Sequence, residues 1–402
     1  MPIRVVHTAD NHVGISFQRY QDTPAVRERL LAERIEALRR IVREANGRQA
    51  HFLVVAGDLF DRPNVARKDI ASAVEVLAGF SGEAVLVLPG NHDFHEGPGS
   101  SLWKTFCDEV GSRPIVLLTR AEVASFEIYG QAVRFYPCPC PSKLGEQSLI
   151  DWVRAAPKEP GAIHVGIAHG NVEGLGMDEQ GRYFNMRQED LRAAGVATWL
   201  LGHIHLPFPE QGSGGSPAFF MPGIPTPDSV KCRHRGHAWY LEIAADGVTG
   251  FEQLVTGGLR FVRLERTLRG RADIEQLERA TAELAAGTPP VAPAEPTARA
   301  APEAGVSAGG LSARDIVLDL QLDGRLRTAD RAALEALLER LREQFLFVSC
   351  VPAIAHELDA AELEGLYPAG SLAHRVIAKL IGDPDHPDAA WLAHELFEEL
   401  RP

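Results

Sequence analysis

The sequence has few cysteines, no excess of positive charge and no long apolar run, and each absence excludes a class of protein. The five cysteines among 402 residues are scattered, which excludes a disulfide scaffold and favours reduced thiols. No apolar run approaches the roughly 18 residues that a membrane span requires. The first residues read as a strand and lack the charged head, apolar run and cleavage site of a signal peptide. We therefore expect a cytoplasmic protein that does not enter a membrane.

The charge balance is acidic, with 41 Lys and Arg against 54 Asp and Glu and a formal net charge of −13. A chain that binds nucleic acid through bulk charge is normally basic, so any such role must come from a local site or from a partner. The acidity is greatest at the end of the chain, where residues 351–402 contain 10 Asp and Glu against 3 Lys and Arg. We expect this end to form a solvated surface or to dock a partner protein.

Short apolar segments that run into polar, glycine-containing turns recur through the first 250 residues. They predict buried strands at Ile3–His7, Phe52–Ala56, Ala84–Leu88, His164–Ala168 and Thr198–Leu201. A helical stripe at Arg27–Ala45 lies between the first two, and such alternation indicates a mostly parallel sheet covered by helices. Strand patterns without helices follow at 125–136 and 219–254, and the turn Ala245-Asp246-Gly247 indicates a hairpin. The expected fold is a layered α/β sandwich of mixed sheets flanked by helices.

The length favours more than one core, and composition suggests where the boundaries fall. We expect a first domain at residues 1–257 and a smaller α/β domain at residues 258–350. The second is interrupted at residues 287–310, where Ala, Pro and Gly dominate and large apolar side chains are nearly absent, as in a flexible segment. Residues 351–402 are expected to form the acidic, helical region that docks a partner.

A set of carboxylate, imidazole and amide side chains follows the carboxyl ends of the five expected strands. Its members are Asp10, His12, Asp58, Asn91, His92, His169, His203 and His205. These groups are hard ligands that suit Mn, Fe, Mg or Zn, and the two oxygens of Asp58 can bridge two ions. Two divalent ions about 3.5–4 Å apart can activate a water and neutralise a phosphate. His92 is placed to protonate a leaving oxygen, and Asp93 is a candidate to orient its ring.

Three motifs carry a resemblance to a known family: GDLFD at Gly57–Asp61, GNHD at Gly90–Asp93 and GHIH at Gly202–His205. They resemble the calcineurin-like metallophosphoesterase superfamily. With the appended small domain they are similar to the SbcD exonucleases, the bacterial counterparts of the double-strand-break repair nuclease of archaea and eukaryotes. The YhaO-type exonucleases are as similar. The resemblance implies a metallophosphoesterase sandwich with a smaller C-terminal α/β capping domain.

The resemblance also implies roles for the individual residues. One metal would be held by Asp10, His12, Asp58 and His205, and the other by Asp58, Asn91, His169 and His203. His92 would be the general acid. Both metals would be manganese, and the activity would be 3′-to-5′ exonuclease on DNA ends with endonuclease on single strands. The implied partner is an SbcC-like ATPase with a long coiled coil, and helices at 65–77 and 101–110 would form a homodimer.

Residues near these motifs are candidates to contact substrate. They are Arg19, Asp61, His95, Arg233 and Arg235, the last two within a basic cluster at residues 231–237. A solvated loop explains that cluster equally simply, and packing on the sheet explains the proposed dimer helices. Two other functions remain open. The chain can be a phosphoesterase that acts on a nucleotide or phosphoprotein, or a DNA-end-binding scaffold with little catalysis of its own.

Overall fold

The computed structural model describes residues 1–176, 181–210, 217–287, 311–358, 360–383, 385–386 and 389–400. It divides into two compact units, Met1–Leu259 and Arg260–Pro402. The segment expected to be flexible, residues 287–310, lies outside the described residues except for Gly287. Each unit has apolar clusters of its own.

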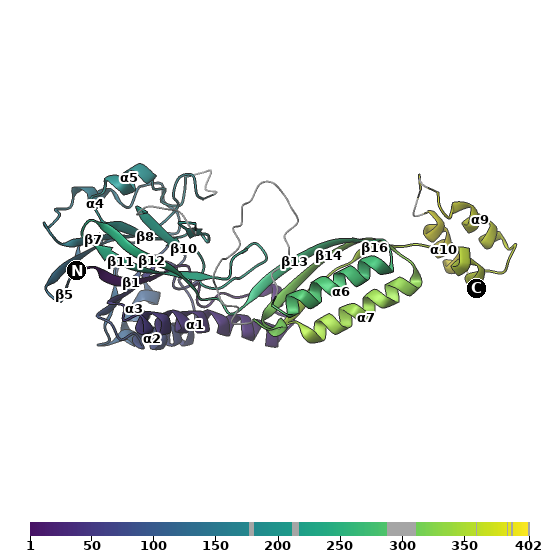
Figure 1. Ribbon diagram of the computed structural model, residues 1–402, viewed down its shortest axis with the longest axis horizontal. Coiled ribbons are helices and arrows are strands. Elements are labelled where there is room, and N and C mark those ends of the chain that lie inside the picture. Colours follow the sequence, from purple (N-terminus) through teal and green to yellow (C-terminus); the bar gives the residue numbers. More distant parts are fainter. Residues whose placement is uncertain are drawn as a thin grey trace. The chain divides into compact units, whose positions relative to one another are not determined.

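The first unit contains two mixed sheets whose strands Figure 1 shows in colours from purple to green. In the first sheet β1, β2, β3 and β4 are parallel, and β11 and β12 extend it as an antiparallel hairpin. Its strands, in spatial order, are β12 (Gly247–Val255), β11 (His237–Ala244), β1 (Ile3–Thr8), β2 (Phe52–Ala56), β3 (Ala84–Leu88) and β4 (Ile115–Leu117). The hairpin predicted from Ala245-Asp246-Gly247 is therefore confirmed.

The second sheet has parallel strands at its centre and antiparallel pairs at both edges. Its strands, in spatial order, are β5 (Ala124–Ile128), β6 (Gln131–Cys138), β7 (Ile163–His169), β8 (Thr198–Gly202), β10 (Phe219–Pro222) and β9 (Pro207–Phe208). All residues of β2, β3, β7 and β8 are buried. This burial explains why these strands are almost continuously apolar, with no polar alternation.

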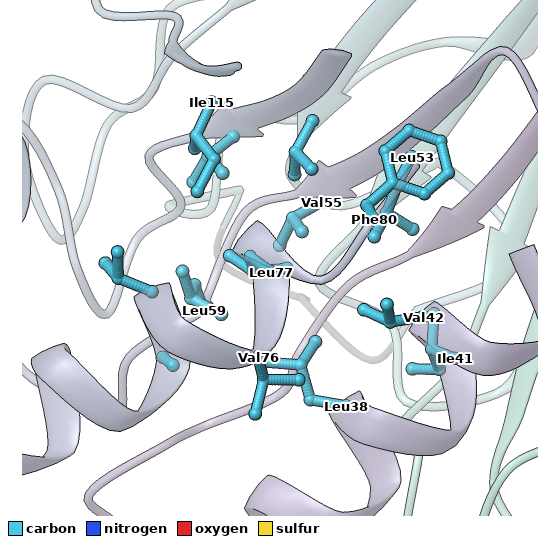
Figure 2. Close-up of a cluster of buried hydrophobic side chains, with 14 of the residues drawn as sticks. Leu38, Ile41, Val42, Leu53, Val55, Leu59, Val76, Leu77, Phe80 and Ile115 are labelled. Carbon is cyan, nitrogen blue, oxygen red and sulfur yellow. The ribbon is translucent and has the colours of Figure 1, made fainter. Parts of the chain in front are cut away.

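Apolar side chains fill three layers of the first unit. One cluster, which includes Val54, Ile167 and Trp239, joins the inner faces of the two sheets. A second lies between the first sheet and the helices α1 (Pro24–Gly47), α2 (Arg67–Ala78) and α3 (Ser101–Val110). Figure 2 shows part of this cluster, where Leu38 and Leu77 extend from helices near Val55. A third lies over the second sheet, against the short helices α4 (Asp151–Ala155) and α5 (Gln188–Ala193).

The second unit contains a smaller sheet with two helices on one face (Figure 1). Its strands are β13 (Arg260–Leu268), β14 (Ile316–Leu326), β15 (Phe347–Cys350) and β16 (Ala353–His356). All pair in parallel, and both β15 and β16 pair with β14. The helices α6 (Arg271–Ala285) and α7 (Thr328–Gln344) cover its apolar face. Helices α8 (Ala360–Leu366), α9 (Leu372–Leu380) and α10 (Ala389–Glu399) form a separate small core.

These elements confirm the predicted fold class, a layered α/β sandwich with mixed sheets and a smaller C-terminal sheet-and-helix region. The helical stripe predicted at Arg27–Ala45 lies in α1, but the prediction needs a correction. The buried face of this helix contains charged residues as well as apolar ones. Leu31 and Ile35 are only half-buried, whereas the charged residues Glu33 and Arg34 are 1% and 2% exposed. The expectation that residues 351–402 are helical is corrected in part, because Ala353–His356 forms strand β16 and pairs with β14. The separation of residues 351–402 as a partner-docking region stays a prediction.

Candidate metal centre

All eight predicted side chains lie at one edge of the two sheets of the first unit. Asp10 and His12 follow β1, Asp58 follows β2, and Asn91 and His92 follow β3. His169 ends β7, and His203 and His205 follow β8. Strands β1, β2 and β3 are parallel neighbours in one sheet, as are β7 and β8 in the other. Their carboxyl ends therefore meet, which is where sites form in parallel sheets.

The backbone of several of these residues adopts a conformation that side chains other than glycine rarely adopt. Positive φ angles occur at Asp10 (54°), His12 (47°), Asp58 (52°) and His203 (98°). They make up four of the eight non-glycine residues with positive φ in the described part of the chain. Such strain concentrates at functional sites, where the surrounding structure holds a side chain in a required direction.

One group of ligand atoms lies at the first sheet and joins β1 to the loop after β8. His12 Nε2 lies 3.3 Å from His205 Nε2 and 3.9 Å from an oxygen of Asp58. His205 Nε2 lies 3.7 Å from Asp10 Oδ1. His205 is the most open member, with a side chain that is 44% exposed, whereas His12 and Asp10 are buried. This arrangement brings together the four residues expected to hold the first ion.

The second group is more deeply buried. Asn91 Oδ1 lies 3.0 Å from both His169 Nε2 and His203 Nδ1. His169 Nε2 also lies 3.3 Å from Asp58 Oδ2, so Asp58 faces both groups. The other ring nitrogen of His169 donates to the carbonyl of Ala56 at 2.9 Å. That bond fixes the tautomer and leaves the Nε2 lone pair for a metal, as second partners of metal-bound imidazoles commonly do.

Two glycines allow this close approach. Gly57 has φ +90°, and a Cβ there would collide with the His169 ring. A Cβ at Gly90 would collide with the carboxylate and backbone of Asp58. The GD and GNHD motifs therefore need glycine because backbone and ligand side chains occupy the same small volume.

The buried charges perturb the protonation of the site in opposite directions. Burial alone would lower the pKa of His169, but Asp58 and Asp10 raise it to about 9. Burial would raise the pKa of Asp58, but His169 and His12 hold it well below its usual range. His203 differs, because burial and the neighbouring His169 lower its pKa to about 3. The negative potential that favours a proton on His169 favours a cation in its place.

His92 is oriented by a different group from the one predicted. Its Nδ1 donates to the carbonyl of Asp61 at 2.9 Å, and its backbone N–H donates to Asp58 Oδ1 at 2.8 Å. Asp93 instead accepts from the backbone N–H groups of Phe60 and Gly90, at 3.0 and 2.7 Å. The expectation that Asp93 orients His92 through a hydrogen bond is therefore wrong. Asp93 is fully buried, and its carboxylate joins two backbone segments instead.

Asp61, predicted to contact substrate, points toward a ligand. Its Oδ1 lies 3.5 Å from His12 Nδ1, and its side chain is only 20% exposed. Burial would raise its pKa, but the contact with His12 outweighs this effect and lowers the pKa. The arrangement is the carboxylate–imidazole pairing that orients metal ligands. The side chain of Asp61 thus supports His12, while its carbonyl supports His92.

The other substrate candidates differ in their exposure to solvent. Arg19 and Arg233 are exposed, whereas His95 and Arg235 are half-buried. The basic loop is anchored beside the site by His234, whose Nδ1 accepts from the N–H of Gly236 at 3.0 Å. Its Nε2 then donates to the carbonyl of His205 at 2.8 Å. The loop with Arg233 and Arg235 is therefore next to a ligand.

Sequence reasoning missed three residues near the cluster. The ring of Tyr183 lies over His203, with centroids 5.0 Å apart. Nothing local in the sequence signals this contact, because Tyr183 comes from an irregular loop. Glu33 and Arg34 of α1 are buried beneath the loops around the site. The sequence did contain a signal for their burial, since they lie three and four residues after Leu30 on the buried face of the helix.

The donor set fits divalent ions. Among the described residues, groups of side chains able to hold a metal are Asp10–His12–His205, His12–Asp61–His92 and Asp10–Asp58–His169. Within each group the ligand atoms lie within 4.8 Å of one another. Two buried carboxylates without a buried Lys or Arg among these groups need a compensating cation. Carboxylate, imidazole and amide oxygen together suit Mn, Fe, Mg or Zn in preference to softer metals.

Comparison with known families agrees with this geometry. Calcineurin-like phosphoesterases match residues 3–207, which is half of the chain and includes every member of the cluster. The chain belongs to this family. It is therefore a metallophosphoesterase, a metal-dependent hydrolase, and its candidate metal ligands follow the ends of its strands. No helix in the described part of this phosphoesterase has the length and apolarity to span a membrane.

Curated proteins of two kinds are similar to part of this phosphoesterase. It is 24% identical over 236 residues to the DNA double-strand break repair protein Mre11 of Methanopyrus kandleri, covering 56% of this chain and 49% of that protein. It is 26% identical over 227 residues to the metallophosphoesterase YhaO of Bacillus subtilis, covering 54% and 52%. The chain thus spans about half the length of these curated relatives.

Among solved structures, the protein TT1561 of Thermus thermophilus matches with a TM-score of 0.39 and 12% identity. The match covers 64% of this chain and 100% of TT1561, and the structural similarity is low.

Proposed function

We propose that this phosphoesterase is a DNA nuclease, acting as a 3′-to-5′ exonuclease with single-strand endonuclease activity. The observation that carries the proposal is the hydrogen bond from His234 to the carbonyl of His205, which fixes the cationic loop beside the ligand cluster. A polyanionic strand needs such a local positive surface, because the chain as a whole is acidic. A relative named as a DNA double-strand break repair protein supports the same substrate.

The residues divide the chemistry between them. Divalent ions held by the two ligand groups would polarise the phosphodiester and activate water. His12 and His169 are fixed by Asp61 and by the Ala56 carbonyl, so their Nε2 atoms face the centre of the cluster. His92 carries a hydrogen on Nδ1 for the Asp61 carbonyl, which leaves Nε2 of the protonated ring to donate to the leaving 3′ oxygen.

The wider setting is also part of the proposal. We propose manganese as the metal in the cell, a cytoplasmic location and a homodimer formed through α2 and α3. We propose an SbcC-like coiled-coil ATPase as partner, docked on the acidic helical end of the chain. Exposed Leu372, Leu392 and Leu396 on α9 and α10 are the apolar contacts that such a docking surface would use.

The test is an assay of the metal-stripped protein with added manganese, magnesium or zinc. Substrates are end-labelled duplex DNA, single-stranded DNA and a chromogenic phosphodiester, and Asp58→Ala is the inactive control. Shortening of DNA from its 3′ ends, dependent on manganese and absent from Asp58→Ala, supports the proposal. Hydrolysis of the diester with DNA untouched, even after addition of the coiled-coil ATPase, supports a phosphoesterase that acts on nucleotides or phosphoproteins. DNA binding without hydrolysis of any substrate supports a scaffold.

His92→Ala tests the role of the general acid. Metal binding should be retained while turnover falls by about 10²–10⁴-fold, the usual contribution of general acid catalysis. Unchanged turnover with metal bound would show that His92 has another role.

A further inference from the structure

Arg34 is a buried cation that the described chemistry does not use. It lies in the middle of α1, and its side chain is 1% exposed. The guanidinium donates through Nη1 to the carbonyl of Thr226 at 3.2 Å, and Nη2 lies 3.6 Å from Asp228. On another side it lies over the ring of Phe17, 5.6 Å from the centroid. Arg34 therefore contacts two segments that are about 200 residues apart in the chain.

These two segments carry the candidate substrate contacts. Phe17 precedes Arg19 in the loop after β1, and it has a strained positive φ of 45°. Thr226 and Asp228 begin the stretch between β10 and β11 that contains Arg233 and Arg235. That stretch ends where His234 donates to His205, so it is attached to the helix at one end and to the ligand cluster at the other.

The surroundings of Arg34 do not favour a buried charged side chain. Among the described residues its Nε and Nη2 have no hydrogen-bond partner. Burial lowers its pKa, against the opposing effects of Asp228, Asp61 and Cys232. A buried cation with unsatisfied donors lowers stability relative to an apolar side chain of similar size. Because Arg34 contacts both segments from a buried position, these contacts suggest that it holds them in place.

We propose that Arg34 is a positioning residue that ties the loop of Arg19 and the loop of Arg233 and Arg235 to α1. It thereby fixes the positions of two loops that carry cationic side chains, and the second of these loops is bonded to the ligand His205. This inference rests on the proposed function for its substrate, but the tethering itself does not. Each loop has a second anchor on α1, since Arg27 donates to the carbonyl of Ser16 at 2.8 Å and the Thr226 hydroxyl donates to Glu33 at 3.5 Å. The larger effect of losing Arg34 is expected in the second loop, because both polar contacts of its guanidinium are made there.

Limited trypsin digestion tests the tethering without reference to activity, because both loops contain trypsin sites. Mass spectrometry would follow cleavage after Arg19 and after Lys231, Arg233 and Arg235 in the wild type and in Arg34→Met. Arg39→Met is the matched control, because Arg39 lies on the same helix and is exposed. Cleavage in the second loop should accelerate about tenfold, the factor expected for loss of one charge-assisted hydrogen bond. Unchanged cleavage in both loops would overturn the proposal.

Steady-state kinetics would test whether the contacts of Arg34 with the two loops matter for substrate binding. Arg34→Met should raise KM for duplex DNA about tenfold and leave kcat/KM for the chromogenic diester within about twofold. The slope of log affinity against log salt should become shallower by about one for each phosphate that the protein no longer neutralises. Arg34→Lys, which keeps the charge but not the planar fork, should restore part of the effect. Equal losses on DNA and on the small diester would show that Arg34 acts on the ligand cluster instead.

Two further variants keep the test valid if Arg34→Met does not fold. Asp228→Asn should loosen only the second loop and Phe17→Leu only the first, each measured by trypsin cleavage. If neither variant changes its own loop, Arg34 does not act through these contacts. Failure of the wild type to cleave DNA would contradict the proposed function alone, because the digestion result would still stand.

Discussion

Both units of this chain contain parallel strands, yet they present different chemistry at the strand ends. In the first unit β1, β2, β3, β7 and β8 run into loops that gather carboxylates and imidazoles. In the second unit β13 and β14 run almost directly into α6 and α7. Among the residues that the structure describes, all three groups able to hold a metal belong to the first unit. The strand-end loops, and not the architecture alone, make the site.

The helix starts of the second unit show what replaces ligands there. The N–H of Arg269 donates to Asp273 at 2.7 Å, and the N–H of Thr328 donates to Glu362 at 2.9 Å. These carboxylates satisfy backbone donors at the starts of α6 and α7, where a partial positive charge favours them. In the second unit acidic side chains on the helices α6 and α8 thus bond to backbone at helix starts, whereas in the first unit acidic side chains after the strands belong to the candidate metal groups.

The largest expected effect comes from removing the carboxylate that both ligand groups share. Asp58→Ala should lower diester hydrolysis by about 10³-fold or more, since several kcal/mol of charge stabilisation are lost. Hydrolysis of a chromogenic phosphodiester and equilibrium binding of manganese would measure this loss. Asp246→Ala, in the exposed turn between β11 and β12, should leave both unchanged. If Asp58→Ala kept its activity, the groups at the strand ends of the first unit would not form the metal site that distinguishes it from the second unit.

A core substitution in the second unit should have the opposite pattern. Leu320 is fully buried in β14, so Leu320→Ala should lower the free energy of unfolding of that unit by about 2–5 kcal/mol. Hydrolysis of the small diester at 25 °C should persist, because the ligands belong to the other unit. Calorimetry of wild type and variant would locate the shifted transition. Loss of diester hydrolysis alongside it would show that the second unit supports the site.

Metal addition should stabilise only the unit that holds the ligands. At a free metal concentration of 100 times Kd, binding to the folded state alone adds about 2.7 kcal/mol to the free energy of unfolding. Thermal unfolding of the stripped protein with and without manganese would show this shift in the first unit. Asp58→Ala serves as the control that should not respond. A metal-induced shift of the second unit would reveal a site there.

The smallest expected effect is a pH dependence from His7 in β1. Burial lowers the pKa of this histidine to about 3, against a smaller opposing effect from the backbone of Leu201. Below pH 6.5 the unfolded chain binds a proton at His7 and the folded chain does not, so stability is present above pH 6.5 and falls as the pH falls. The slope from one such group is about 1.4 kcal/mol per pH unit.

His7→Leu should remove that part of the slope from the first unit between about pH 6 and pH 4. Denaturant unfolding at several pH values would compare the variant with the wild type. The remaining slope should come from other histidines of lowered pKa, such as His203. An identical slope in both proteins would show that His7 is protonated in the folded state.

Local patterns predicted most of the first unit because its strands are short, apolar and bounded by turns. Phe52–Ala56, Ala84–Leu88 and the helix 101–110 have the boundaries expected from the sequence. Partners across the fold were harder to predict. The Asp93–His92 bond was expected from adjacency in sequence, but the loop after β2 supplies a carbonyl that is better placed. Likewise the contact of the Asp61 carboxylate with His12 was not expected from the sequence, and its role toward substrate stays a prediction.

The sequence by itself determined which chemistry is present: ligand-type side chains at five strand ends, with glycines that admit them. It could do so because strand and turn signals act between neighbours in the chain. Only the tertiary structure decided which atoms meet, as in His169 with Asn91, 78 residues apart, or Arg34 with Thr226, 192 residues apart. Such contacts depend on sheet order, strand register and helix packing. These are set by the burial of many side chains at once, and no local pattern records them.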